Sequence, residues 1–251
     1  MESEKGMKDM KKRSFKAVLL LFVLTTLTIA LGGCSGDKKG DISSQITIGI
    51  PQDLEDSLDP HKMVTAGTRE VLFNIFEGLV KVTSDGDFVP AVASSYEETE
   101  GGKVYTFTLR DNVKFHDGST VTAEDVKFSL DKCADTSAGE PLVAAFSNID
   151  SVNILDDKTV QVVLKEADTE FLAYMTTAII PASNADPDTN PIGTGPYKFV
   201  SRSPQENFVM ERFDDYWGEP AYIKDVTLKI CANADTIVMD LEGGSIDMFA
   251  R

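Results

Sequence analysis

The stretch Tyr105–Leu130 reads YTFTLRDNVKFHDGSTVTAEDVKFSL and contains the signals of a strand, a turn and a helix in direct succession. Tyr105, Phe107 and Leu109 alternate with polar residues, which is the two-residue period of a strand that buries one face. The stretch therefore predicts a half-buried strand at its start.

A turn and a capped helix follow that strand. Asp117-Gly118 predicts the turn, because glycine adopts positive φ without a steric penalty. Thr122 precedes Asp125 by three residues, a spacing typical of reciprocal capping at a helix N-terminus. The apolar residues expected on the buried face of the helix are Val126, Phe128, Leu130 and Cys133.

The pair His116-Asp117 raises the question of catalysis, because catalytic triads combine these two residue types. Neighbouring side chains on an extended backbone point apart, which separates the Asp117 carboxylate from the His116 ring. The chain has two histidines, and its sequence contains no nucleophile elbow, zinc-protease motif, phosphate-binding loop or dinucleotide fingerprint. We therefore predict a turn histidine with a structural hydrogen bond, in a protein that is not an enzyme.

Periodicity and turn residues divide the rest of the chain into short elements. Strands are expected at residues 45–51, 151–154, 159–164, 197–200, 207–212, 225–230 and 245–250. Helices are expected at residues 68–80, 168–175 and 234–244. A passage rich in Pro, Gly and Asn at 181–199 is expected to cross between subdomains.

The chain is acidic, with 24 Lys and Arg against 41 Asp and Glu in 251 residues and a net charge of −17. This length is enough to bury one large core or two small ones. Binding to a nucleic acid backbone requires clustered basic residues, so the composition excludes nucleic acid as a partner.

The N-terminus differs in kind from the rest of the chain. A basic cluster at Met10–Lys16 precedes an uncharged apolar run at Ala17–Leu31, which has the length of a signal-peptide core. The run ends in LGGC, which resembles a bacterial lipobox with Cys34 as its last residue. We expect a lipoprotein signal peptide at 1–33, a lipid on the Cys34 thiol and a flexible tether at 34–45. A plain secretory signal and an uncleaved anchor are the alternatives.

Cys133 and Cys231 are the cysteines that remain once Cys34 carries a lipid. Export permits a disulfide between them, whereas a helical Cys133 and a Cys231 at the end of a strand favour two separate buried thiols. Both alternatives stay open from the sequence. Neither cysteine has a histidine nearby, so no metal site and no cofactor are expected.

Residues 105–130 resemble the signature segment of the family 5 extracellular solute-binding proteins, which are the oligopeptide-, dipeptide- and nickel-binding components of bacterial ABC importers. IGTGPYKFV and LDPHKMVTAGTREVLFNIFEGLV are similar to the family's Gly-Thr-Gly-Pro-Tyr turn and to its first loop and helix. The resemblance continues in order through VPAVASSYEET, ERFDDYWGEPAYIKDVTLKI and DLEGGSIDM, so that it covers nearly all of residues 46–249.

The resemblance implies an α/β fold of the periplasmic-binding-protein kind, type II, large cluster. Residues 46–85 and 188–251 are expected to form the first lobe, and residues 86–187 a small mixed subdomain inserted into it. Family members close two lobes around a solute and deliver it to a membrane permease. The second lobe has no counterpart here, so a fragment or N-terminal half is expected.

The resemblance also places one wall of the solute cleft in the loop after Asp59-Pro60. The residues that match this wall by position are Met63, Val64, Thr65, Ala66 and Gly67. A peptide would pair with their backbone groups as an added strand does, and an ordinary surface loop is the alternative. Gly193–Pro196 is expected to be a structural turn, and Trp217 to pack in the core rather than offer a stacking surface.

The sequence thus predicts a lipid-anchored substrate-binding protein of an ABC importer on the outer face of the cytoplasmic membrane, the periplasmic side where an outer membrane exists. Peptides are the expected solute and ABC permease subunits the expected partners. Nickel is disfavoured, because the loop has no histidine beyond His61. The alternative is an interaction or signalling lipoprotein that is built on the same lobe and transports nothing.

Overall fold

The computed structural model describes residues 44–54, 56–137 and 139–250. The expected signal peptide and its Cys34 lie outside these residues, as does all but the last part of the expected tether. No helix in the described part of the chain is long and apolar enough to cross a membrane.

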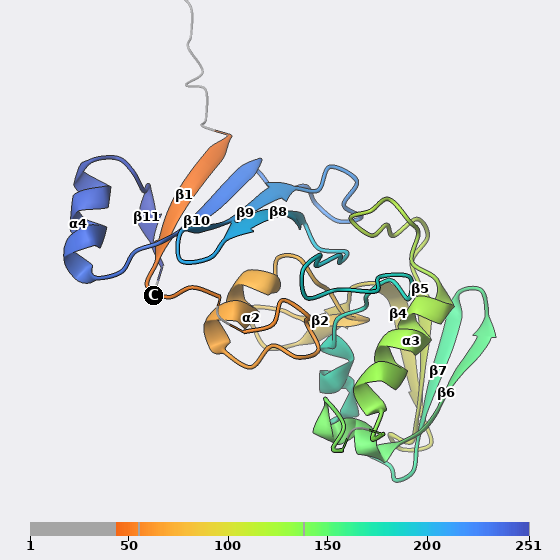
Figure 1. Cartoon of the computed structure of the whole chain (residues 1–251). Helices are drawn as coiled ribbons and strands as arrows, with labels where there is room; N and C mark the ends of the chain where they lie inside the picture. The colour runs from red at the N-terminus through yellow and green to blue at the C-terminus, as the bar shows by residue number, and fades with distance from the viewer. Residues whose placement is uncertain (1–43, 55, 138, 251) are drawn as a thin grey trace, which may run out of the picture. The chain divides into compact units, whose positions relative to one another are not determined.

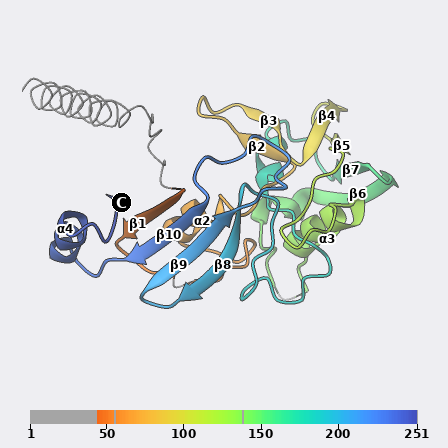
Figure 2. The same cartoon turned by 90° about the horizontal axis from the view of Figure 1, so that it is seen from above.

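The first sheet has the strand order β11–β1–β10–β9–β8 (Figures 1 and 2). In that order its strands are Met248–Phe249, Gln45–Ile50, Asp225–Ile230, Asn207–Arg212 and Tyr197–Ser203. β1 runs parallel to both of its neighbours, β10 and β11. β9 runs antiparallel to both of its neighbours, β8 and β10. The first described strand, β1, thus lies between the last two strands, β10 and β11. The predicted binding loop follows β1 directly.

α2 (Ala66–Leu72) packs its buried residue Leu72 in one cluster with apolar residues of this sheet. The expected helix at 68–80 is wrong in extent, because α2 ends at Leu72. The Asn74 side chain donates to the carbonyl of Val71 at 3.1 Å, and the Asn74 carbonyl accepts the N–H of Tyr197 at 3.1 Å. A distant segment therefore takes up the carbonyl that a longer helix would use.

The second sheet has the order β4–β5–β7–β6, with antiparallel neighbours throughout. These strands are Ala93–Thr99, Val104–Leu109, Thr159–Leu164 and Ile149–Asp156. The other described elements are a hairpin of β2 (Val80–Val82) and β3 (Phe88–Pro90), helices α3 (Ala123–Ala134) and α4 (Ala234–Glu242), and the 3₁₀ helices η1 (Ala144–Asn148) and η2 (Phe171–Thr176).

The strand, turn and capped helix predicted for residues 105–130 are all present. Tyr105 and Phe107 are fully buried on β5, and Gly118 has a φ of 89°. Thr122 Oγ1 accepts the N–H of Asp125, and Asp125 Oδ2 accepts the N–H of Thr122, so the reciprocal cap is confirmed.

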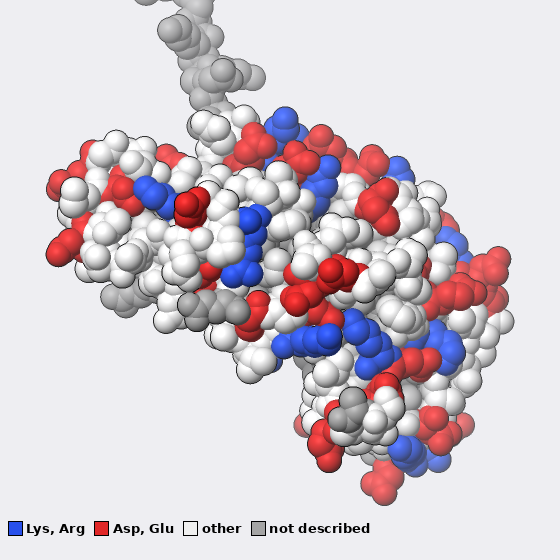
Figure 3. All heavy atoms as spheres, in the orientation of Figure 1, with Lys and Arg blue, Asp and Glu red and all other residues white. Residues whose placement is uncertain are grey.

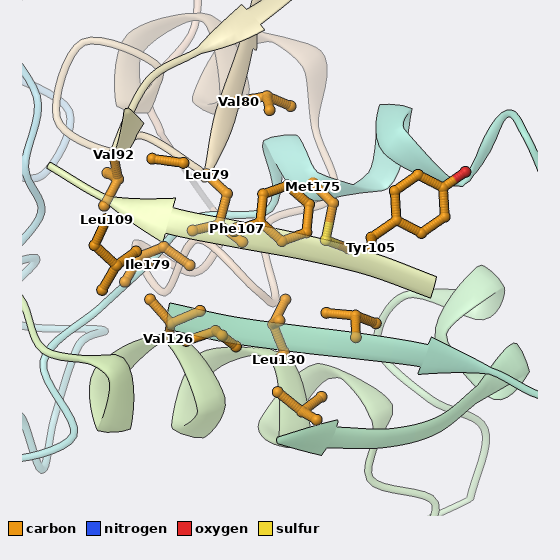
Figure 4. Packing of buried hydrophobic residues seen from close by; sticks show 14 of the residues in the cluster. Leu79, Val80, Val92, Tyr105, Phe107, Leu109, Val126, Leu130, Met175 and Ile179 are labelled. Carbon is orange, nitrogen blue, oxygen red and sulfur yellow. The ribbon is translucent and has the colours of Figure 1, made fainter. Parts of the chain in front are cut away.

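One side chain of α3 departs from the prediction. Val126, Leu130 and Cys133 are fully buried in the cluster shown in part in Figure 4. Phe128 is 36% exposed instead, and its expected place in the core is wrong. Residues 126, 130 and 133 share one face of a helix, whereas residue 128 lies two positions from either neighbour and faces elsewhere.

Cys133 and Cys231 are both free and buried, which decides between the two alternatives left open by the sequence. Burial raises the pKa of the Cys133 thiol to about 12, so this side chain behaves as a small apolar group. Figure 3 shows acidic and basic side chains interspersed over one face, in keeping with a charge excess that is spread along the chain.

Candidate ligand-binding site

The loop between β1 and α2 brings part of the predicted site to a groove with a volume of about 1010 Å³. Apolar side chains of β1 and β10 line one part of the groove, and Thr65–Gly67 line another. Val64 is 75% exposed and lies outside this lining. Met63 packs against the core and lines a second pocket of about 580 Å³. The structure therefore brings Thr65–Gly67 together and directs Met63 elsewhere.

The carboxylate of Asp56 accepts hydrogen bonds from several residues at the end of the loop. Its Oδ2 accepts the backbone N–H groups of Val64, at 2.7 Å, and Thr65, at 2.9 Å. Its Oδ1 accepts the hydroxyl of Thr65 at 3.1 Å and also that of Thr68. Burial alone would raise the pKa of Asp56, but these hydrogen bonds outweigh it and lower the pKa to about 2. Asp56 is thus ionised at neutral pH.

Sequence reasoning missed Asp56. Its partners follow it by 8, 9 and 12 residues, and no short capping or turn motif links positions so far apart. Only the folded path of the loop brings the donors to one carboxylate.

Further aspartates, among them Asp188 and Asp59, hold the same loop from other directions. Asp188 Oδ1 accepts the N–H of Leu58 at 2.8 Å. Asp59 has a side chain that is 1% exposed, and its Oδ2 lies 2.9 Å from the Lys132 ammonium of α3. A buried ion pair of this kind fixes geometry more than it adds stability. The loop is therefore anchored at several points before it enters α2.

Among the backbone groups of the loop that have no hydrogen-bond partner in the part of the chain that the structure describes, two lie next to each other at its end. They are the carbonyl of Val64 and the N–H of Ala66, on either side of Thr65. Thr65 is extended, with φ of −76° and ψ of 143°. In an extended segment these two groups point to the same side, which is the hydrogen-bonding edge that a strand offers to a partner.

His116 is a structural residue of a different region. Its Nε2 lies 3.0 Å from the carbonyl of Gly195, and its Nδ1 accepts the N–H of Gly193 at 3.2 Å. Phe213 packs edge-on against the ring, and Asp117 bonds within its own turn instead of orienting the ring. Burial lowers the pKa of His116 to about 4, so the ring is neutral. The predicted structural hydrogen bond is confirmed.

Gly193 and Gly195 lie too close to the residues that follow α2 to carry a side chain. A Cβ atom at Gly193 would lie 2.1 Å from the carbonyl oxygen of Ile75, and one at Gly195 would lie 2.5 Å from that of Asn74. The N–H of Gly195 donates to the Ile75 carbonyl at 2.9 Å. These contacts support the prediction of a structural turn.

Trp217 packs beside the buried cluster of the second sheet, as the sequence predicts. Its Nε1 donates to Glu77 at 2.6 Å, and the Tyr216 hydroxyl donates to the other oxygen of the same carboxylate at 2.7 Å. Arg110 stacks over the ring at 4.5 Å from its centroid. Burial raises the pKa of Glu77. The indole is occupied by these contacts and is not available to stack against a ligand.

The model of the bacterial extracellular solute-binding proteins, family 5 Middle, matches residues 87–251. The chain belongs to this family. Family 5 proteins are extracytoplasmic binding proteins and not enzymes, in agreement with the structural role of His116 and with the prediction.

Curated relatives of this family 5 chain include proteins with different solutes in their names. The oligopeptide-binding protein AppA of Bacillus subtilis is 30% identical over 268 residues, which cover 95% of this chain and 48% of AppA. The nickel-binding periplasmic protein of Escherichia coli is 30% identical over 201 residues, which cover 76% of this chain and 38% of that protein.

Solved structures confirm the expected periplasmic-binding-protein fold. The binding protein AgaA in complex with agropinic acid, from A. tumefaciens R10, has a TM-score of 0.73 at 31% identity and covers 80% of this chain, whereas the match covers 43% of AgaA. The protein DppA from Helicobacter pylori, in complex with the peptide STSA, has a TM-score of 0.72 at 27% identity and covers 80% of this chain, against 45% of DppA. The chain spans half or less of the length of these relatives, and the predicted lobe boundaries stay predictions.

Proposed function

We propose that this family 5 chain is the substrate-binding part of a lipid-anchored ABC importer component that takes up peptides. Membership of the family supports solute binding. Among the similar proteins, AppA is named an oligopeptide-binding protein, and the structure of DppA contains the peptide STSA. The observation that carries the choice of peptides is the unpaired carbonyl of Val64 beside the unpaired N–H of Ala66 in the described residues.

An extended peptide fits this pair of groups. One peptide residue would donate its N–H to the Val64 carbonyl and accept the N–H of Ala66 with its own carbonyl, which is the bonding pattern of a parallel ladder. Such bonds are independent of side chains, which suits a receptor for peptides of varied sequence. The predicted wall Met63–Gly67 is proposed to bind through Val64 and Ala66, with Met63 packed behind them.

Nickel is a second candidate, because one curated relative is a nickel-binding protein. His61 is the histidine of this loop, and its Nε2 lies 2.8 Å from the carbonyl of Ala178. Its ring is 1% exposed, and burial lowers its pKa. A histidine already bound inside the core is poorly placed to ligate a solute metal, so this contact favours peptides over nickel.

One open loop cannot enclose a ligand or exclude water from it. Because the chain spans half or less of its relatives, we propose that a complete cleft needs a second lobe in addition to residues 46–251. The affinity of this chain alone for a short peptide is expected to be no better than about 1 mM, since most binding energy would come from that enclosure.

The membrane anchor is proposed from the sequence, because Cys34 lies outside the described residues. A lipid on Cys34 would hold the protein at the outer face of the cytoplasmic membrane without a spanning helix. ABC permease subunits in that membrane are the proposed partners, and the receptor would deliver its peptide to them.

A matched pair of variants tests the peptide proposal. Ala66→Pro removes the N–H donor at the first position of α2, where proline is tolerated and where the extended Thr65 before it is compatible with proline. Ala234→Pro makes the same change at the first position of α4, where the extended Asn233 precedes it and which lies outside the groove lining. Titration with tri-alanine is expected to show about tenfold weaker binding for Ala66→Pro and unchanged binding for Ala234→Pro. Equal affinity of Ala66→Pro and wild type would contradict the proposal.

A further inference from the structure

Asp56 holds the loop without being free to meet a ligand. An ionised carboxylate has about four acceptor positions. Four donors reach Asp56, namely the N–H groups of Val64 and Thr65 and the hydroxyls of Thr65 and Thr68. Its acceptor capacity is therefore filled from within the loop, and any part that it plays in binding must act through the groups that it holds.

Asp56 and the first turn of α2 together set the direction of the Val64 carbonyl and the Ala66 N–H. The carbonyl and the N–H of a trans peptide point in opposite directions. The N–H of Thr65 points at Asp56, 2.9 Å away, so the carbonyl of Val64 in the same peptide points away from it. The carbonyl of Thr65 accepts the N–H of Arg69 at 3.2 Å, which directs the N–H of Ala66 outward in the same manner.

Helix capping does not account for this arrangement. The hydroxyl of Thr65 already caps α2, because it accepts the N–H of Thr68 at 3.4 Å. The shortest backbone contact of Asp56 is the 2.7 Å bond from the N–H of Val64, which precedes the cap and lies outside the helix. Asp56 thus fixes the segment that leads to the helix as well as its first turn.

We propose that Asp56 is a positioning residue, which holds the extended segment at Thr65 so that the Val64 carbonyl faces outward beside the Ala66 N–H and can pair with an extended peptide. The inference rests on the proposed function for the identity of the ligand. The orientation itself can be measured without a ligand. A loop ordered in advance binds more tightly, because its ordering entropy is not lost on binding.

The test uses Asp56→Asn in the full chain. Asparagine has nearly the same shape, but it is neutral and keeps only one acceptor oxygen for the four donors that reach Asp56. We expect the amide hydrogen exchange of Val64 and Thr65, followed by NMR, to accelerate at least about tenfold. Asp156→Asn is the matched control, because Asp156 accepts the N–H of Lys158 at 2.8 Å in the β6–β7 turn and its loss should leave the binding loop unchanged.

Affinity for tri-alanine is the second readout. Asp56→Asn is expected to bind about tenfold more weakly than wild type. Thr68→Val removes one hydroxyl but keeps both backbone bonds to Asp56, so its exchange rates at Val64 and Thr65 and its affinity should stay near wild type. If Asp56→Asn does not fold, Asp56→Ser, which keeps one small acceptor, takes its place.

Unchanged exchange at Val64 and Thr65 in the Asp56 variant would overturn the proposal. So would a loosened loop that still binds tri-alanine as wild type does. If the wild-type chain itself shows no binding, the peptide function fails, and the exchange rates alone decide whether Asp56 positions the loop.

Discussion

His116 joins two segments that lie far apart in the sequence, through both nitrogens of its ring. Its bonds to Gly193 and Gly195 hold the Gly-Thr-Gly segment against the turn that follows β5. The sequence was sufficient to predict a structural histidine, because no catalytic motif surrounds it and Asp117 points away. The identity of its partners was beyond prediction, since they lie 79 and 77 residues away along the chain.

This burial makes stability dependent on pH. The folded pKa of His116 is about 4, against an ordinary value of 6.5. The unfolded chain therefore binds the proton first, so the contribution of His116 is complete above pH 6.5 and is lost as the pH falls towards 4. The loss is expected to reach up to about 3 kcal/mol. Burial also lowers the pKa of His61, which acts in the same direction.

Urea unfolding at several pH values checks this prediction with His116→Gln. The variant should be less stable than wild type at neutral pH and should lose less stability on acidification. Glu77 and other titrating groups contribute equally to both proteins, so the difference between them isolates His116. Identical pH profiles for the two proteins would contradict the account.

Local sequence patterns predicted the secondary-structure elements whose limits are set by contacts between nearby residues. Alternation located β1, β5, β7, β9 and β10, and the Thr122–Asp125 spacing located the start of α3. The end of α2 was predicted wrongly, because the Asn74 carbonyl bonds to Tyr197, which belongs to β8. Segment 168–175, expected to be a helix, overlaps instead with a shorter 3₁₀ helix, η2, at Phe171–Thr176. The type of this helix and its two ends depend on tertiary packing, which cannot be predicted from neighbouring residues in the sequence.

The cap of α3 is open to direct measurement. Thr122→Ala removes the hydroxyl that accepts the N–H of Asp125, and leaves the Asp125 carboxylate without its hydroxyl partner. We expect a loss of about 1 kcal/mol in the free energy of unfolding, measured with urea. Thr122→Ser keeps the hydroxyl and should recover most of that loss. Equal stability of the alanine and serine variants would show that the cap contributes little.

The candidate site spans segments that only the whole fold brings together. The sequence resemblance pointed to Met63–Gly67, and the structure places Thr65–Gly67 on a groove shared with β1 and β10. The aspartates that fix the loop were not predicted, because their partners are spread over the sequence. The assignment of this loop as the binding site stays a prediction, and the fold shows how its backbone is held.

Attachment to the membrane is a property of the whole protein that rests on one residue. Cys34→Ser removes the thiol that would carry the lipid and leaves the rest of the chain unchanged. We expect the variant to move from the detergent phase to the aqueous phase in detergent partitioning of expressing cells. Retention of the variant in the detergent phase would show an uncleaved anchor instead of a lipid.

The central claim is that a peptide pairs with the backbone of the loop between β1 and α2. The most direct measurement is an NMR titration of the isotope-labelled chain with tri-alanine, which resolves weak binding residue by residue. The account predicts saturable shift changes centred on Val64–Gly67, with a dissociation constant of about 1 mM or weaker, that largely disappear in Ala66→Pro and persist in Ala234→Pro. Shift changes centred elsewhere, or equal binding by Ala66→Pro and wild type, would contradict it.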